Sequence, residues 1–340
     1  MSAGPADPIR SVVGDAEWLA HRYDPGHDAF HYRRVPRARR GEVPFLTDDC
    51  LGPATDTPVL RRGDAAAAAP PGELHFVFHS AFCASTMLAH AMDRPGSSMG
   101  LSEPVLLNDL VGWRRRGADP RLHGRVMADA LAQLARPFAP GEATVVKPSN
   151  VVNPLAAGMM LLRPGARALL LHAPLPVFLA SVARKGLWCR LWCRELLEGY
   201  LLDRFVDLGF EPRDHFRQTD LQVAAVGWLA QHASFAALAR RFGPARVATL
   251  DSDRLTSDPQ GVVTAAAGFF GFPDRPGPGA ARALFRDSKT GAAFEPGQRD
   301  REQRAARAAY GDEIDKVVDW AATVADRAGV ALDLPLPLRA

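Results

Sequence analysis

The sequence predicts an α/β protein in which a central parallel sheet is flanked by helices. Apolar runs of strand length alternate with longer segments of helical periodicity, which is typical of βαβ units. The apolar runs are continuous rather than alternating, as expected of strands that are buried on both faces. The chain has 340 residues, of which 47% are apolar, and this is enough to bury a large core.

The expected elements follow one another in a regular order. Four buried strands are predicted at residues 74–79, 143–147, 166–173 and 246–250, and each leads into a helical segment, at 85–93, 150–162, 176–186 and 258–271. Three more helices are predicted at 123–136, 187–205 and 221–242. The regular domain is expected to span 73–340, because its first strand begins at about residue 73.

The first 72 residues are expected to form an N-terminal extension and a linker. Residues 1–47 mix Pro, Arg and Asp around few apolar positions, and residues 47–72 are rich in Gly, Pro, Thr and Ala. The arginine cluster at 33–40 has no periodicity. It is therefore expected to face solvent, and an arm that closes over an anionic ligand is the second interpretation.

The charge balance excludes several classes of partner. Lys and Arg number 41 against 38 Asp and Glu, so the net charge of +3 does not suit a nucleic-acid coat or a polybasic membrane binder. A polyanionic ligand must then be held by local groups. Four scattered cysteines, no signal-peptide pattern and no apolar run of about 18 residues predict a cytoplasmic protein with reduced thiols and no membrane span. The histidines lack zinc-ligand spacing, so no metal is expected.

The segment 79–86 connects a predicted buried strand to a predicted helix. A loop of backbone N–H groups at a helix N-terminus can hold a phosphate. In the phosphate-loop pattern GxxxxGK[ST], Ser85 stands in the position of the lysine, which disfavours a magnesium-dependent kinase. An ordinary turn with Ser85 as the N-cap is the alternative.

Residues 76–88, with the pair Ser85-Thr86, resemble the phosphosulfate-binding loop of the sulfotransferase family. Further segments resemble the family in matching order, at 100–104 (GLSEP), 145–150 (VVKPSN), 166–186 and 247–272, so that the resemblance covers about 74–295. It implies a P-loop NTPase-like fold of the sulfotransferase type. It also implies metal-free transfer of a sulfuryl group from 3′-phosphoadenylyl sulfate (PAPS) to a hydroxyl or amine.

The resemblance implies a role for each matching residue. Glu103 is the expected general base, because Ser149 stands where one branch of the family has a histidine base, and Lys147 is expected to contact the phosphosulfate or the leaving group. The residues expected to bind PAPS are Phe82, Cys83, Ala84, Ser85 and Thr86 at the phosphosulfate, His172 and Ser181 at the 3′-phosphate, and Lys289 in a late basic segment at 286–299.

Three of these positions depart from the family pattern. Phe82 and His172 stand where the family has basic residues, and Ala84 replaces the loop glycine, so the phosphosulfate loop is degenerate. Besides an enzyme, the sequence therefore allows a sulfotransferase-fold protein that has lost PAPS and serves as a binding or scaffold module, and, third, a P-loop kinase. The apolar segments 105–125 and 186–220 favour a small-molecule or lipid-like acceptor. The sequence makes no prediction of oligomeric state.

Overall fold

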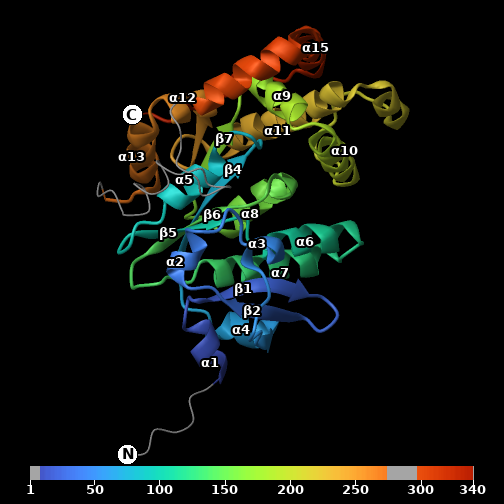
Figure 1. Ribbon diagram of the computed structural model, residues 1–340. Coiled ribbons are helices and arrows are strands. Elements are labelled where there is room, and N and C mark those ends of the chain that lie inside the picture. The colour runs from blue at the N-terminus through green and yellow to red at the C-terminus, as the bar shows by residue number, and fades with distance from the viewer. Residues whose placement is uncertain (1–7, 274–296, 340) are drawn as a thin grey trace, which may run out of the picture.

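Five parallel strands form the centre of the protein (Figure 1). The computed structural model describes residues 8–273 and 297–339. The strands are β4 (Glu73–His79), β5 (Ser98–Ser102), β6 (Ala143–Lys147), β7 (Ala168–His172) and β8 (Val247–Asp251). Their order across the sheet is β5-β6-β4-β7-β8, and every neighbouring pair is parallel. The predicted fold class, a central parallel sheet flanked by helices, is confirmed.

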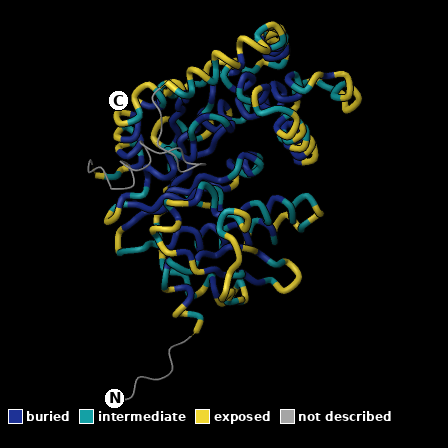
Figure 2. The backbone as a smooth tube through the Cα atoms, in the orientation of Figure 1, coloured by how far each residue is buried: buried dark blue, intermediate teal, exposed yellow. Residues whose placement is uncertain are grey.

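Both faces of this sheet are buried, and side chains alternate between two cores. On β4, Val77 lies in one core while Phe76 and Phe78 lie in the other. The first core packs against α5 (Ser85–Ala91), α9 (Leu175–Arg184) and α15 (Gln298–Ala328), and the second packs against α6 (Val105–Arg115), α7 (Pro120–Leu134) and α8 (Ala156–Leu162). Helix α11 (Asp220–Phe242) contributes to both cores. Figure 2 shows the resulting buried interior.

The four predicted strands are present, but the pattern of apolar runs did not predict β5. This strand reads Ser-Met-Gly-Leu-Ser and has only two large apolar residues, so it lacks the continuous apolar run of its neighbours. Its central Gly100 allows α5 to pack closely, since a Cβ there would lie 1.8 Å from the carbonyl oxygen of Ala89. The glycine that this contact requires interrupts the apolar pattern, so the sequence does not read as a strand here.

Residues 8–68 contain more regular structure than an extension and linker would. An antiparallel sheet is formed by β1 (Trp18–Asp24), β2 (Ala29–Arg34) and β3 (Val59–Arg61), in that order. Helices α1 (Pro8–Val13), α2 (Arg37–Arg40), α3 (Asp48–Leu51) and α4 (Arg62–Ala68) accompany it. Strand β3 and helix α4 lie within the segment expected to be a connector. The division of the chain at residue 72 stays a prediction.

The expectation that the whole arginine cluster faces solvent is wrong. Arg37 forms ion pairs with Asp93 at 2.7 Å and Glu142 at 2.8 Å. Arg40 is only 4% exposed, and its guanidinium lies 4.7 Å from the ring centroid of Phe138. These contacts attach the N-terminal segment to the edge of the parallel sheet, and they give the buried guanidinium groups the partners that a buried charge requires.

The remaining helices complete the sequence of elements. They are η1 (Asn150–Leu155), α10 (Leu187–Leu202), η2 (Pro212–Arg217), α12 (Ser252–Ser257) and α13 (Pro259–Phe270). After α15 the chain returns to the sheet, where the Thr249 amide donates to the Leu336 carbonyl at 2.8 Å and the Leu338 amide donates to the Thr249 carbonyl at 2.8 Å. Within 8–273 and 297–339, no helix has the length and apolar character needed to cross a membrane.

Candidate active site

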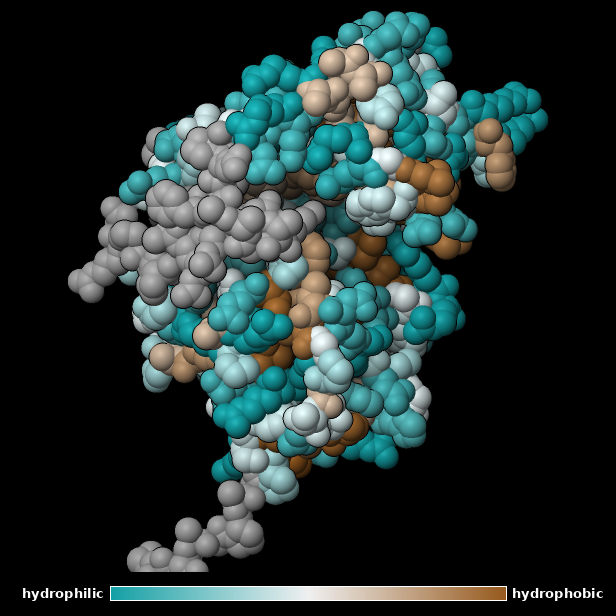
Figure 3. Space-filling model, viewed as in Figure 1, coloured by the Kyte–Doolittle hydropathy of each residue, from teal (hydrophilic) through white to brown (hydrophobic). Residues whose placement is uncertain are grey.

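A cavity of about 260 Å³ lies at the carboxyl ends of β4, β5 and β6. Ligands of open α/β sheets bind at this edge, where loops follow neighbouring parallel strands. Figure 3 shows hydrophobic surface along α10 and in the hollow below it. The cavity is lined by Phe45, His79, Ala81, Phe82, Cys83, Ala84, Ser85, Thr86, Glu103, Ser149, Asn150, Trp188 and Trp192.

The loop after β4 has a left-handed backbone at three residues other than glycine. The φ angles are 72° at Ala81, 52° at Phe82 and 59° at Ala84. Each such residue costs free energy, because its Cβ approaches the following carbonyl oxygen. Ala84 therefore adopts the conformation for which a glycine is suited, and the loop keeps this shape without one. Backbone strain of this kind is concentrated at ligand-binding sites.

Both polar and apolar residues of this loop line the cavity. Ser85 and Thr86 begin α5 and line the cavity. Cys83 is fully buried, and burial raises the pKa of its thiol, so it is protonated at neutral pH and is not a thiolate nucleophile. Phe82 packs against Trp192, and the Lys185 ammonium lies 5.6 Å from the centroid of the Phe82 ring. A cation from the end of α9 thus lies beside the position where the sequence lacks a basic residue.

Glu103 and Lys147 form an ion pair at the cavity. Lys147 ends β6 and is 0% exposed, whereas the Glu103 side chain is 17% exposed. The Lys147 ammonium contacts the Glu103 carboxylate and lies 3.4 Å from the hydroxyls of both Thr86 and Ser102. It also lies 5.0 Å from the ring centroid of Phe45. The buried charge therefore has an acidic partner, two hydroxyls and an aromatic face.

The strand register explains why Glu103 meets Lys147. Ser102 at the end of β5 is paired with Lys147 at the end of β6, so the next residue, Glu103, lies beside the lysine. The Glu103 amide donates to the Lys147 carbonyl at 2.7 Å. The φ of Glu103 is 49°, so this residue also has a left-handed backbone.

His79 begins the segment 79–86 that the sequence predicts at the phosphosulfate, and it lines the cavity, but no individual role was predicted for it. Its Nδ1 accepts from the Ala81 amide at 3.1 Å, and its Nε2 lies 3.1 Å from the Pro148 carbonyl oxygen. Both contacts fit the neutral ring with its hydrogen on Nε2. The same Nε2 is 3.7 Å from the Glu103 carboxylate. The sequence feature that points to His79 is its position as the last residue of a buried strand, directly before the loop.

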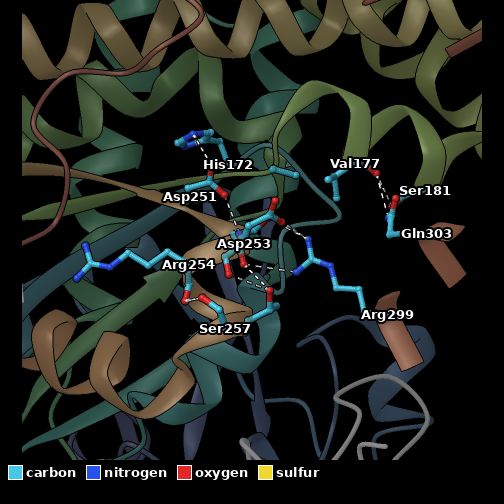
Figure 4. Close-up of polar contacts among 12 residues, drawn as sticks. His172, Val177, Ser181, Asp251, Asp253, Arg254, Ser257, Arg299 and Gln303 are labelled. Carbon is cyan, nitrogen blue, oxygen red and sulfur yellow. Dashed lines mark hydrogen bonds and ion pairs between the residues drawn. The ribbon is translucent and has the colours of Figure 1, made fainter. Parts of the chain in front are cut away.

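Neither His172 nor Ser181 lines this cavity, and Figure 4 shows the contacts of both residues. His172 ends β7 and lines a different cavity, where its Nε2 is 4.0 Å from the Asp251 carboxylate. Burial lowers the pKa of His172, so the ring does not supply the positive charge of an arginine. The Ser181 hydroxyl donates to the Val177 carbonyl at 2.9 Å and accepts from the Gln303 amide at 3.2 Å. These contacts hold Ser181 between α9 and α15.

Of the late basic segment, only residues 297–299 are described, and Lys289 lies outside the described residues. Arg299 donates to the Ser252 hydroxyl at 3.1 Å and lies 3.4 Å from the Asp253 carboxylate (Figure 4). Among residues 8–273 and 297–339, no three His, Cys, Asp or Glu side chains are grouped so that they could hold a metal ion.

A scan against protein-family models found no match to this chain, and a search of curated proteins found none either. Solved structures of sulfotransferases are similar to it. The sulfotransferase domain from the Curacin biosynthetic pathway has 16% identity and a TM-score of 0.44, covering 80% of this chain and 94% of that one. Sulfotransferase STF9 from Mycobacterium avium has 12% identity and a TM-score of 0.43, covering 74% and 78%. A sulfotransferase from Alicyclobacillus acidocaldarius has 14% identity and a TM-score of 0.42, covering 78% and 98%.

Proposed function

We propose that this protein is a sulfotransferase that moves a sulfuryl group from PAPS to a hydroxyl or amine of a small, partly apolar acceptor. The observation that carries the proposal is the Glu103–Lys147 ion pair beside the loop after β4, three of whose residues have a left-handed backbone conformation. Glu103 lines the cavity and supplies a carboxylate for the acceptor proton, and its buried partner Lys147 lies behind the lining residue Thr86 as a cation for the leaving phosphate. The motif resemblance of residues 76–88 and 145–150 supports the same reaction.

The residues of the loop fit the phosphosulfate of PAPS. The hydroxyls of Ser85 and Thr86 and the backbone of 82–86 line the cavity and would hold its oxygens. Lys147 lies 3.4 Å from the Thr86 hydroxyl, so its charge is close to the same place. Lys185 beside Phe82 adds a second cation next to the loop. Ser181 and Lys289 remain proposed contacts on the 3′-phosphate side.

In the proposed reaction the Glu103 carboxylate takes the proton of the acceptor hydroxyl. The acceptor oxygen forms a bond to sulfur, and the bond between sulfur and the bridging phosphate oxygen breaks. Adenosine 3′,5′-bisphosphate leaves with the electron pair of that bond, and Lys147 stabilises the charge that develops on its 5′-phosphate. The contact between His79 and Glu103 helps to keep the carboxylate directed at the cavity.

The acceptor is proposed to be apolar, because α10 presents large hydrophobic side chains beside the cavity. Leu187, Trp188 and Leu191 are 68%, 60% and 49% exposed, and Trp188 also lines the cavity. Exposed apolar side chains that are continuous with a cavity favour a ligand with an apolar body. A small-molecule or lipid-like acceptor fits this surface.

Binding of the cofactor product tests the first half of the proposal. Calorimetry of the full chain with adenosine 3′,5′-bisphosphate should give saturable micromolar binding, weakened about tenfold by Ser85→Ala through a lost hydrogen bond to a charged group. Ser181→Ala tests the contact on the 3′-phosphate side in the same way. No binding at millimolar bisphosphate would favour a binding or scaffold module, and binding of magnesium ATP alone would favour a kinase.

The role of Glu103 is tested by Glu103→Gln, with transfer from PAPS to 2-naphthol as the assay. Turnover should fall about 10²–10⁴-fold, as expected when a general base is lost, while bisphosphate affinity is kept. Glu198→Gln is the matched control, because Glu198 is exposed on α10 and does not line the cavity. Equal turnover of the two variants would remove Glu103 from the mechanism.

A further inference from the structure

A second cavity, of about 410 Å³, lies at the ends of β7 and β8 and shares no lining residue with the first. Its walls come from α9, α11, α15 and the chain after α15. Most of the lining is apolar, with Leu250 from β8, Trp228 from α11 and Val318 from α15. A volume of this size falls within the range of small-molecule sites, about 300–1,000 Å³.

His232 on α11 is a buried polar group in this lining that has no partner. It is 0% exposed, and neither ring nitrogen has a hydrogen-bond partner. The Leu332 backbone raises the pKa of His232, against the larger lowering that burial causes. The ring lies flat on Trp228, with centroids 3.6 Å apart, and edge-on to His172, with centroids 4.9 Å apart. Since buried polar groups in folded proteins are nearly always paired, this arrangement points to a missing partner.

His172 presents a second unpaired nitrogen at the same cavity. Its Nδ1 is buried without a hydrogen-bond partner, while its Nε2 faces the Asp251 carboxylate at 4.0 Å (Figure 4). Burial lowers the pKa of both imidazoles, that of His232 to about 2, so both rings are neutral at pH 7. Each neutral ring keeps one nitrogen that accepts a hydrogen bond.

The charged residues of this cavity are on balance acidic. Asp251 and Asp333 contribute two carboxylates, against the single guanidinium of Arg254. That guanidinium donates to the Leu338 carbonyl and so is held by the end of the chain. The cavity therefore offers a ligand more hydrogen-bond acceptors, from the carboxylates and the imidazoles, than hydrogen-bond donors.

We propose that this second cavity binds a small amphipathic amine, with the ammonium at Asp251 and His172 and the apolar body against Trp228, Leu250 and Val318. An ammonium carries only hydrogen-bond donors, which matches the acceptors present. The apolar body fills a volume that leucine, valine and proline side chains surround. This inference does not depend on the proposed sulfuryl transfer.

Three probes of one shape test the charge preference on the full chain. The probes are 2-phenylethylamine, 2-phenylethanol and phenylacetate, which differ only in the polar group. Calorimetry at pH 7.5 should show saturable binding of the amine, about tenfold weaker binding of the alcohol and none of the acid. Equal binding of all three, preference for the acid or absence of amine binding would overturn the proposal.

Asp251→Asn locates the bound amine. Asn is also a good N-cap, so the variant keeps the bond from the Asp253 amide that begins α12 and should stay folded. Amine affinity should fall about tenfold, while adenosine bisphosphate binding is unchanged. Asp312→Asn is the matched control, since its carboxylate is 84% exposed on α15. If both variants bind the amine like the unmodified chain, the site lies elsewhere and the proposal fails.

His232→Phe provides an independent test, because it keeps a flat aromatic ring and removes both unpaired nitrogens. Removing unsatisfied buried polar atoms should raise the melting temperature of the free protein. The stabilisation that 2-phenylethylamine adds to the melting temperature should become smaller. A free protein of lower melting temperature with full amine stabilisation would show that His232 is not part of the site.

Discussion

Four residues of the candidate active site have a left-handed backbone although none is glycine. They are Ala81, Phe82, Ala84 and Glu103, with φ between 49° and 72°. Such conformations persist only where the surrounding contacts impose them. At Ala81 the contact is the hydrogen bond to His79, and at Glu103 it is the bond to the Lys147 carbonyl. Hydrogen bonds to residues at the ends of the strands thus offset the conformational strain of these loops.

Ala84→Gly should stabilise the protein, because glycine adopts φ of 59° without the Cβ penalty. We expect the free energy of unfolding in urea to rise by about 1 kcal/mol. Ala308→Gly is the control, since Ala308 is exposed within α15 and glycine in a helix should cost about 1 kcal/mol. Two changes of the same sign would contradict a left-handed Ala84.

The positions of Lys147 and His79 could be predicted from the sequence, Glu103 was expected from the family resemblance of 100–104, and Phe45 was not predicted. Lys147 and His79 end continuous apolar runs, and the ends of neighbouring parallel strands meet at one edge. The His79 ring accepts a hydrogen bond from the Ala81 amide, and the Phe45 ring faces the Lys147 ammonium. Both contacts depend on distances in the folded chain that a sequence pattern does not record. Phe45 also comes from the N-terminal segment, which the sequence separates from the sheet.

At the level of elements, strands with continuous apolar runs were predictable and β5 was not. Runs such as ATVVK at 143–147 match β6 residue for residue. Strand β5 lies at the edge of the sheet and derives its stability from hydrogen bonds to β6 and from packing under α5. The long α15 was likewise not anticipated, because most of its surface is polar and few of its residues are buried.

The chain after α15 covers the outer edge of β8. Thr249 exchanges backbone hydrogen bonds with Leu336 and Leu338, and Leu338 is buried. An open edge strand is a template for pairing with another chain.

Ending the chain after Pro335 should therefore lower the free energy of unfolding by about 3 kcal/mol, from a lost buried leucine and lost hydrogen bonds. Light scattering should also detect larger assemblies than the full chain forms under the same conditions. A chain that ends after Leu338 is the control and should match the full chain. Equal stability of both truncations would show that the tail does not protect β8.

At the level of the whole molecule, several buried histidines connect stability to pH. Burial lowers the pKa of His75 and of His90 to about 4 and that of His232 to about 2. In the unfolded chain each titrates near about 6.5. Below this pH the unfolded state binds protons that the folded state does not, so acid favours unfolding.

The free energy of unfolding should be greatest above pH 6.5 and should fall as pH decreases toward 4.5. Each of these histidines contributes a slope of about 1.4 kcal/mol per pH unit. Urea denaturation between pH 7.5 and 4.5 measures the slope. His90→Gln, which can still donate to the Val43 carbonyl, should reduce it by one histidine's share. A slope that is unchanged in this variant would exclude His90 as a contributor.

The order of apolar runs determined four of the five parallel strands, because strands buried on both faces usually form nearly continuous apolar runs. The same order placed Lys147 and Ser85 at one edge of the sheet, whereas Glu103 follows β5, which has no continuous apolar run. Only the tertiary structure decided that Ala84 keeps a glycine-like backbone, that Lys185 lies over Phe82 and that His172 turns to a second cavity with His232. These features depend on contacts between residues far apart in the chain, and local patterns in a sequence do not record such contacts.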